Sequence, residues 1–321
     1  MRELKYFSPS SYMMFESDLD TFVMNYLLDS VRQREPSSVQ MSLGSAFDAF
    51  VKNALMKHTD PALTEPGKDF HLETLFNKQV SEEHQGWAWV EGKYLFDKYK
   101  EYGAYDQLLE DLEGRQSPVY FEREAMASVK MPDGRYVPFR GYPDGWYRNR
   151  EGRLVILDWK CNGFRANNKH SPKKYFVIIR PKNEPHKFVT PVTKYGMNVQ
   201  DQFCFSKTDE KWAAQLTIYS WLLGEPIVND TVLQIEQVLM GAGEESPDVR
   251  IATYRGFTTP EFQTTLAERI QTAWIVINSG HIYRNTTREK SDERIKQLER
   301  RATAMFDDNP ILQIVREANK R

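Results

Sequence analysis

The stretch that decides the fold runs from Gly141 to Lys160 and reads GYPDGWYRNREGRLVILDWK. The run from Leu154 to Trp159 is apolar apart from Asp158, which is typical of a buried strand. A turn at Gly152 separates this strand from the preceding one. Because alternate side chains of a strand point to the same face, Asp158 and Lys160 share one face. Asp144 is expected to reach the same place from the preceding strand. The sequence therefore predicts two carboxylates and a lysine on one side of a hairpin.

These residue types suit metal-dependent phosphodiester hydrolysis. Mg²⁺ prefers hard oxygen ligands and needs only one or two carboxylates from a protein, so Asp144 and Asp158 are candidate ligands. The backbone carbonyl of Trp159 can complete the coordination sphere, and Mn²⁺ could replace Mg²⁺. Lys160 can orient the attacking water or neutralise charge that develops on the phosphate. The alternative is that Asp144 belongs to an ordinary Pro-Asp-Gly turn and that the other two are surface residues of a strand. Against it, a carboxylate inside an apolar run is costly unless it is paired or binds a metal.

The composition excludes several other classes of site. The chain has 321 residues, of which 40% are hydrophobic, so it can bury a substantial core. Two cysteines are too few for an iron–sulfur cluster or a four-cysteine zinc site, and the six histidines show no HExxH spacing. Neither a Walker A nor a GxGxxG sequence is present, so we expect neither ATP nor a dinucleotide as cofactor. The net charge of −2 means that any contact with DNA must come from local basic patches.

Periodicity along the chain predicts an α/β fold. A helical N-terminal part (1–115) precedes a core (116–260) and C-terminal helices (261–321), all within one domain. Within the core, we expect strands over 118–129, 136–147 and 154–160 to form an antiparallel meander. Further elements are expected as follows: helices over about 12–27 (capped by Ser10 or Ser11), 42–56, 83–113, 210–223 and 260–279, strands over about 231–240 and 249–255, and a charged helical tail.

With these elements in order, the sequence resembles the RecB-like branch of the PD-(D/E)XK nuclease superfamily. SPSSYMMFESDLDTFVMNYLL (8–28) resembles the branch's N-terminal helix signature, and LGSAFDAFVKNAL (43–55) resembles its Gly-x-x-x-His helix. GYPDG and LDWK correspond to the central acids and lysine, and QLTIY (215–219) to the QxxxY helix. GHIY (280–283) is similar to the closing segment. The resemblance spans much of the chain and implies a restriction-endonuclease-like core, a central mixed sheet flanked by helices with an N-terminal helical arm.

The resemblance also implies roles for individual residues. Asp144, Asp158 and Lys160 match the core motif, and Gln215 and Tyr219 would line the site and touch DNA or hold Lys160. Asp48 stands where the family has histidine, and we expect it to be an additional metal ligand; the alternative is a solvated charge beside the apolar stripe of its helix. Iron–sulfur members of this branch carry four cysteines that are missing here, so no cluster is expected.

A basic stretch follows the LDWK strand, in an insertion (163–208) longer than a compact fold needs. From Arg165 to Lys194 it has eight Lys or Arg residues against one acid, with aromatic residues between them. Basic residues neutralise phosphates and aromatic rings stack on bases, so this mixture suits DNA, although a plain solvated loop is the alternative. The residues that we expect to bind DNA are Arg165, Lys169, Lys173, Lys174, Arg180 and Lys182.

The function that the resemblance implies is a Mg²⁺-dependent DNA exonuclease, using one or two metal ions, of bacteriophage recombination, repair or degradation. A structure-specific or endonucleolytic nuclease, a catalytically decayed DNA-binding module and an RNA-directed nuclease are the alternatives. DNA is the expected partner. If the protein acts in recombination, a single-strand annealing or single-strand binding protein is the expected protein partner. No sequence feature indicates an oligomer. No apolar run approaches the roughly 18 residues of a membrane span, and the N-terminus lacks a signal peptide's apolar stretch. We therefore expect a soluble cytoplasmic protein, in the host cytoplasm if phage-encoded.

Overall fold

The computed structural model describes residues 3–28, 38–164, 207–241, 249–279 and 288–307. The chain divides into two compact units by its internal contacts. Unit 1 comprises Met1–Glu35, Met126–Gly141 and Glu261–Arg321, and unit 2 comprises Pro36–Ala125 and Tyr142–Pro260. The expected single domain over 1–321 stays a prediction. No helix in the described part of the chain is long and apolar enough to cross a membrane.

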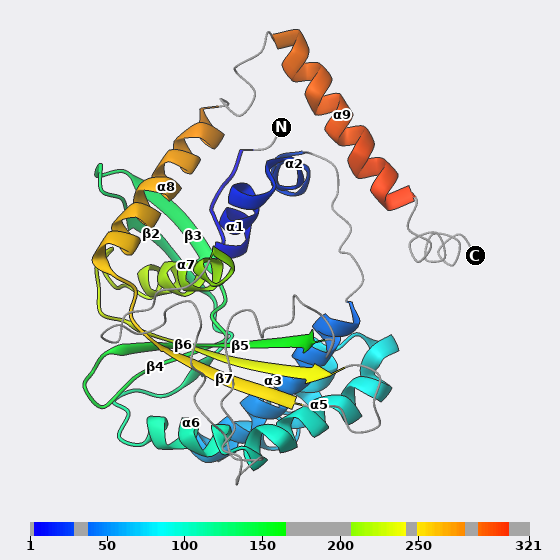
Figure 1. Ribbon diagram of the computed structural model, residues 1–321, viewed down its shortest axis with the longest axis vertical. Coiled ribbons are helices and arrows are strands. Elements are labelled where there is room, and N and C mark those ends of the chain that lie inside the picture. Colours follow the sequence, from blue (N-terminus) through cyan, green and yellow to red (C-terminus); the bar gives the residue numbers. More distant parts are fainter. Residues whose placement is uncertain (1–2, 29–37, 165–206, 242–248, 280–287, 308–321) are drawn as a thin grey trace. The chain divides into compact units, whose positions relative to one another are not determined.

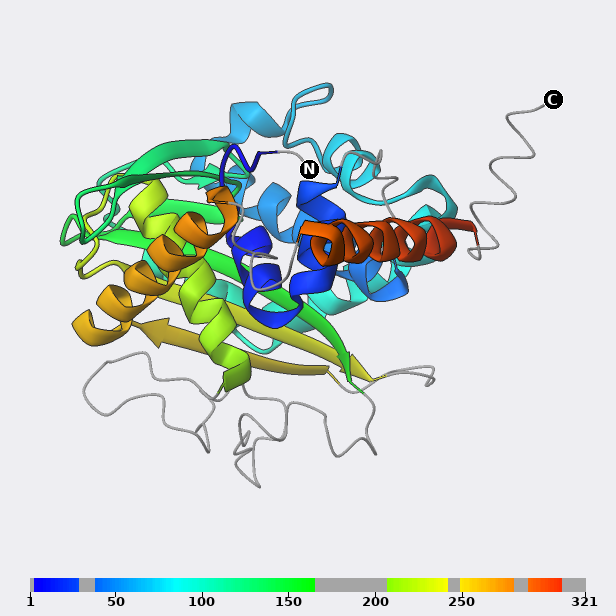
Figure 2. The same ribbon diagram turned by 90° about the horizontal axis from the view of Figure 1, so that it is seen from above.

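Unit 2 is built on a five-stranded sheet in the order β1-β4-β5-β6-β7. Its two longest central strands, β5 and β6, run parallel, and the other neighbours are antiparallel, which confirms the predicted mixed sheet. Strands β5, β6 and β7 lie side by side in both ribbon views (Figures 1 and 2). The bounds of the strands are β1 Tyr120–Phe121, β4 Gly145–Arg148, β5 Leu154–Phe164, β6 Val232–Gly241 and β7 Val249–Gly256.

Helices cover both faces of this sheet, as expected, and Figure 1 shows α7 on one side with α3, α5 and α6 on the other. The bounds are α3 Val39–Thr59, α4 Leu72–Gln79, α5 Gln85–Glu101, α6 Ala104–Leu112 and α7 Lys207–Leu222, with short 3₁₀ turns at Pro61–Thr64 and Glu82–His84. Ser38 caps α3 by accepting a hydrogen bond from the Met41 amide. The helix expected over 83–113 is two helices, because Gly103 adopts a left-handed φ of 78° between them.

The expected three-stranded meander is confirmed in its pairing order, because β1 pairs with β4 and β4 with β5, both antiparallel, but each of its first two strands is divided between two sheets. The segment 118–129 divides at Glu122, whose φ of 45° is unusual for a residue with a side chain, into β1 and the strand β2 (Ala125–Lys130). The segment 136–147 likewise divides into β3 (Tyr136–Gly141) and β4. Strands β2 and β3 pair with each other in a two-stranded sheet of their own. In the main sheet, β5 therefore pairs with β4 and β4 with β1.

Unit 1 gathers segments from both ends of the chain around this β2-β3 pair. Its elements are α1 Pro9–Ser17, α2 Leu19–Phe22, a π-helical turn Val23–Leu27, α8 Pro260–Asn278 and α9 Arg288–Asp307. Ser8, rather than Ser10 or Ser11, caps α1, and it forms a reciprocal capping box with Ser11. Phe7 joins the unit's core, where its ring packs against the aromatic rings of Phe22, Phe139 and Trp274.

Candidate functional site

The register of β4 and β5 brings the two sequence-predicted aspartates to neighbouring places in unit 2. Gly145 pairs with Leu157, so Asp144 and Asp158 lie next to each other across the two strands. One carboxylate oxygen of Asp144, Oδ2, accepts a hydrogen bond from the backbone amide of Trp159 at 3.1 Å. The carboxyl of Asp144 is thus held against the backbone of β5.

Asp158 and Lys160 share one face of β5, as the strand periodicity predicts. The Lys160 Nζ lies 2.9 Å from Oδ1 and 2.7 Å from Oδ2 of Asp158, which is itself 2% exposed. Asp158 Oδ2 is buried, and the partner that the described residues give it is the Lys160 ammonium. Burial lowers the pKa of Lys160, but the charges of Asp158 and Asp144 outweigh burial and raise this pKa above its ordinary value. Lys160 is therefore a cation at neutral pH.

Helix α7 supplies the two further residues that the sequence indicates. Gln215 and Tyr219 lie one helical turn apart, on the same side of α7. The Lys160 Nζ donates a hydrogen bond to Gln215 Oε1 at 3.2 Å, so the ammonium is held from both β5 and α7. The buried Tyr219 hydroxyl donates to the carbonyl of Tyr142 at 3.2 Å, two residues before Asp144. Both side chains therefore connect α7 to the segments that carry the acids and the lysine.

The electrostatics of Asp144 reflect two acids placed close together. Burial and the neighbouring charge of Asp158 raise the pKa of Asp144 to about 7, against the opposing effects of Lys52 and Lys160. A carboxyl with so high a pKa is incompletely neutralised by the protein alone. The arrangement would consequently be stabilised by an added cation.

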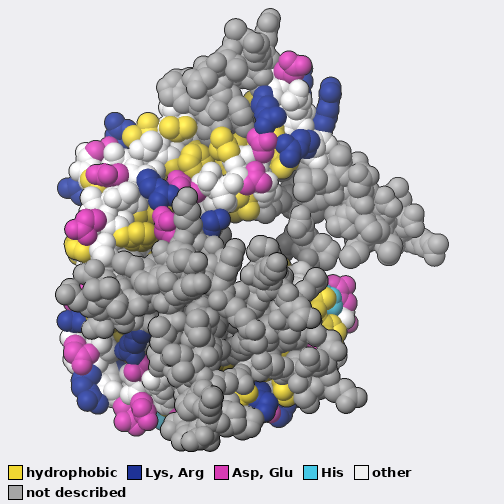
Figure 3. Space-filling view, viewed as in Figure 1, with side chains coloured by type: hydrophobic (Ala, Val, Ile, Leu, Met, Phe, Trp, Pro, Cys, Tyr) yellow, Lys and Arg dark blue, Asp and Glu magenta, His cyan; other side chains and the backbone are white. Residues whose placement is uncertain are grey.

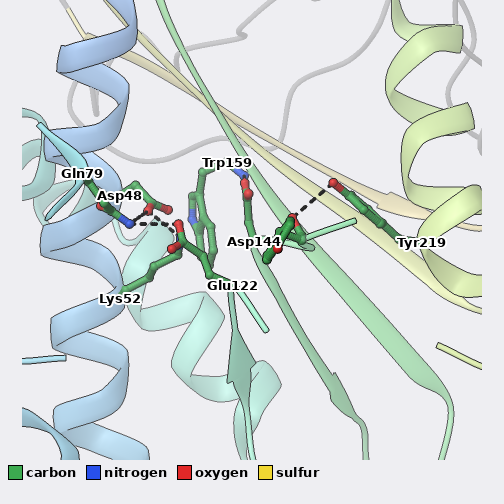
Figure 4. A network of polar contacts seen from close by, with 8 residues as sticks. Asp48, Lys52, Gln79, Glu122, Asp144, Trp159 and Tyr219 are labelled. Atoms are coloured by element: carbon green, nitrogen blue, oxygen red, sulfur yellow. Dashed lines mark hydrogen bonds and ion pairs between the residues drawn. The ribbon is translucent and has the colours of Figure 1, made fainter. Parts of the chain in front are cut away.

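A second polar group lies around Asp48 on α3, and we name it the Lys52 network: Asp48, Lys52, Gln79 and Glu122. Figure 4 shows these four side chains pointing toward one another, on one side of Trp159, with Asp144 and Tyr219 on the other side in that view. Lys52 Nζ contacts Asp48 Oδ2 at 2.5 Å and Glu122 Oε1 at 2.8 Å. Gln79 Nε2 donates to the same two oxygens, at 3.0 and 2.9 Å. The expectation that Asp48 binds a metal stays a prediction, and in this structure its Oδ2 already has two donors.

The donor set at Asp144 and Asp158 fits a magnesium ion. No group of three or more His, Cys, Asp or Glu side chains that could hold a metal occurs among the described residues. Mg²⁺ does not need one, because it retains several waters and is bound by one or two carboxylates. Asp158 Oδ2 is a buried carboxylate oxygen of the required kind, and in this structure the Lys160 ammonium lies 2.7 Å from it. The same oxygen-only donors do not suit zinc, which prefers nitrogen and sulfur.

Sequence reasoning missed three of the four members of the Lys52 network. Lys52 carried a usable signal, because it follows Asp48 by four residues in an otherwise apolar part of α3. Glu122 follows β1 at a backbone bend with a φ of 45°, which the sequence pattern does not indicate. Gln79 ends α4, a helix that the sequence pattern did not predict.

The residues expected to bind DNA lie outside the described part of the chain. This applies to Arg165, Lys169, Lys173, Lys174, Arg180 and Lys182. On the face drawn in Figure 3, the basic and acidic side chains of the described residues are interspersed. Neither sign of charge forms a continuous patch among the described residues visible there.

Comparisons with known proteins add little to this geometry. No protein-family model and no curated protein matches the chain. Among solved structures, the chain is similar to one described as "Crystal structure of SSO0001", at 11% sequence identity and a TM-score of 0.27. The similarity covers 82% of this chain and 86% of that chain. A similarity at this level carries no argument about function, so the site must be judged from its own residues.

Proposed function

We propose that the chain is a metal-dependent DNA nuclease with the restriction-endonuclease-like core of the PD-(D/E)XK superfamily. One observation supports the proposal most. Asp144, Asp158 and Lys160 lie together where the start of β4 pairs with β5, and Gln215 from α7 joins them. These residues come from three separate elements of unit 2. A surface turn and an ordinary strand would not require a buried aspartate paired with a lysine that α7 also holds.

Asp144 and Asp158 would hold the Mg²⁺ ion, together with the backbone carbonyl of Trp159. When bound, the ion would polarise the phosphate and lower the pKa of a water. Asp144 suits this role because its position is fixed by the Trp159 amide, and because it is a buried acid directly beside a second acid, Asp158. The pair therefore favours a divalent cation on physical grounds as well as by resemblance.

Lys160 would contact the scissile phosphate and neutralise charge as the bond breaks. Its ammonium is protonated, partly exposed, and oriented by Asp158 and Gln215. A donor held in place before the substrate arrives stabilises a transition state without further reorganisation. Tyr219 would act as a positioning residue, because its hydroxyl ties α7 to the chain just before Asp144.

An exonuclease of the RecB-like kind, acting in phage DNA recombination, repair or degradation, is the specific activity that we propose. A structure-specific or endonucleolytic nuclease shares the same site and differs in whether an internal strand can enter it. The test is digestion of end-labelled linear DNA and covalently closed circular DNA with Mg²⁺, Mn²⁺ or EDTA. We expect linear DNA to be degraded with either metal and circular DNA to survive, with no activity in EDTA. Cleavage of the circle would favour an endonuclease, and preferential cleavage of an RNA competitor would redirect the proposal to RNA.

A DNA-binding module that has lost hydrolysis is the second candidate, and the Lys52 network favours it. Lys52 bonds to Asp48, at the position where the resemblance implies a metal-binding histidine. This candidate predicts retention of DNA on a filter or gel but no cleavage of any DNA form, even in Mn²⁺. The same digestion experiment therefore separates the two candidates.

A further inference from the structure

Lys52 is one of the most completely buried charged residues of the described part of the chain and lies within α3. Its side chain is 1% exposed, and its helix neighbours Val51 and Leu55 belong to the hydrophobic core. A buried ammonium is costly unless it is paired and hydrogen-bonded. Lys52 meets both conditions, through Asp48 Oδ2 at 2.5 Å and Glu122 Oε1 at 2.8 Å.

Gln79 makes the arrangement around Lys52 more specific. Its amide nitrogen donates to the same Asp48 and Glu122 oxygens that contact the ammonium. Each of these two oxygens therefore has a charged and a neutral donor. Oxygen atoms engaged in this way are not free to bind a metal ion unless Lys52 leaves. Since Glu122 is 42% exposed, the network borders solvent on its Glu122 side.

The Lys52 network and the proposed metal pair flank the same residue of β5. In Figure 4 the network lies on one side of Trp159 and Asp144 on the other. The backbone amide of Trp159 donates to Asp144 Oδ2 at 3.1 Å. The Lys52 ammonium is therefore a fixed positive charge beside the proposed magnesium ligands.

We propose that the Lys52 ammonium takes the place of a second divalent cation, so that the site binds a single ion between Asp144 and Asp158. Asp48 and Glu122 then serve as partners of Lys52 and are not metal ligands. The inference rests on the proposed function, because it assumes an ion at Asp144 and Asp158. Lys52 is then a positioning residue, and its positive charge is present whether or not metal is bound.

Calorimetric titration of the full chain with Mn²⁺ in the absence of DNA tests the inference. We expect one ion per wild-type chain and none in Asp158→Asn. Lys52→Met frees the oxygens of Asp48 and Glu122 and is expected to bind a second ion. Lys57→Met removes an exposed lysine from the same helix and should leave the stoichiometry at one. Two ions in the wild type, or a folded Lys52→Met protein that binds only one, would overturn the inference.

Asp48→Asn provides a second measurement that does not require the loss of Lys52. The Lys52 ammonium keeps Glu122 as a charged partner in this variant. We expect Mn²⁺ affinity within about twofold of the wild type, whereas loss of a true metal-site residue typically lowers affinity at least about tenfold. A tenfold loss would overturn the inference. If the wild type binds two ions and cuts DNA, only the role of Lys52 fails; if it binds none and cuts nothing, the proposed function fails with it.

Discussion

At the scale of single residues, the central strands of unit 2 contain two buried carboxyl groups in different environments. Asp158 on β5 has a lysine beside it, whereas Glu236 on β6 is held by neutral donors. Gln234 Nε2 and Thr253 Oγ1 each donate to the Glu236 carboxyl at 2.8 Å. Burial outweighs these hydrogen bonds and raises the pKa of Glu236 to about 7. Glu236 is therefore a source of pH-dependent stability that is separate from the proposed chemistry.

Glu236→Gln should flatten the pH dependence of the unfolding free energy. Since the folded pKa lies above the ordinary value of 4.5, the contribution of Glu236 is fully present below pH 4.5 and is lost as the pH rises through about 7. Between pH 4.5 and pH 8, the wild type should lose about 3 kcal/mol more stability than the variant. Denaturant unfolding at several pH values measures the difference. Parallel curves for the two proteins would contradict the assignment.

Individual site residues could be predicted where a short periodicity governs their placement. Alternation along a strand placed Asp158 and Lys160 together, and helical spacing placed Gln215 and Tyr219 together. The rest of the Lys52 network could not be predicted in this way, because Gln79 and Glu122 contact each other and Lys52 from distant segments. Their position depends on how α4 and the bend at Glu122 pack against α3, which no local pattern encodes.

At the scale of elements, the close contact of α3 with α5 depends on one glycine. A Cβ added to Gly92 would lie 2.6 Å from the Ala46 Cβ and 3.1 Å from the Ala46 carbonyl carbon. Both helices are part of the layer that positions Asp48 and Lys52. The contact therefore links the packing of α5 to the position of α3 against β5.

Gly92→Ala should lower the unfolding free energy by about 1–3 kcal/mol, because the two helices must move apart to admit a methyl group. Gly86→Ala is the matched control, since a Cβ at Gly86 of the same helix meets nothing within 4 Å. The control should be neutral or stabilising by up to about 1 kcal/mol, through the higher helix propensity of alanine. Urea unfolding compares both variants with the wild type. An equal effect of the two substitutions would show that the helices are not in close contact at Gly92.

Element types and the pairing order of the first three strand segments were predicted more successfully than the breaks within them. Most of the helices and strands lie near their expected positions, because apolar periodicity indicates which face is buried. The segments 118–129 and 136–147 pair with each other as expected, although each divides between two sheets. Periodicity is the same on either side of the bend at Glu122 and of Pro143, so the sequence pattern could not reveal these breaks.

At the scale of the whole molecule, the mixed sheet with helices on both faces was predictable, while the division into two units was not. Unit 1 combines residues from both ends of the chain with the β2-β3 pair. Contacts between segments so far apart in sequence leave no local pattern. The motifs of the nuclease resemblance follow one another along most of the chain, and for this reason one domain was expected.

The basic insertion should supply the main electrostatic contact with DNA. Lys173→Ala combined with Lys174→Ala is expected to weaken DNA binding and to reduce the slope of log affinity against log salt by about 1.4 for single strands. Lys57→Ala combined with Lys68→Ala removes two exposed lysines from the described residues as a control for net charge. Fluorescence anisotropy across a salt series provides the slopes. Equal slopes for the two double variants would remove the insertion from the DNA-binding role.

We propose that Asp158 and Lys160 carry out metal-dependent cleavage of DNA. A single-turnover digestion of end-labelled linear DNA in Mg²⁺ tests this proposal. Asp158→Asn and Lys160→Ala should each reduce the rate constant by at least about 100-fold. The matched surface variants Asp69→Asn and Lys68→Ala should cleave at the wild-type rate. Wild-type cleavage that is lost only in the first pair is the predicted result. An inert wild type, or full activity in Asp158→Asn and Lys160→Ala, would contradict the account.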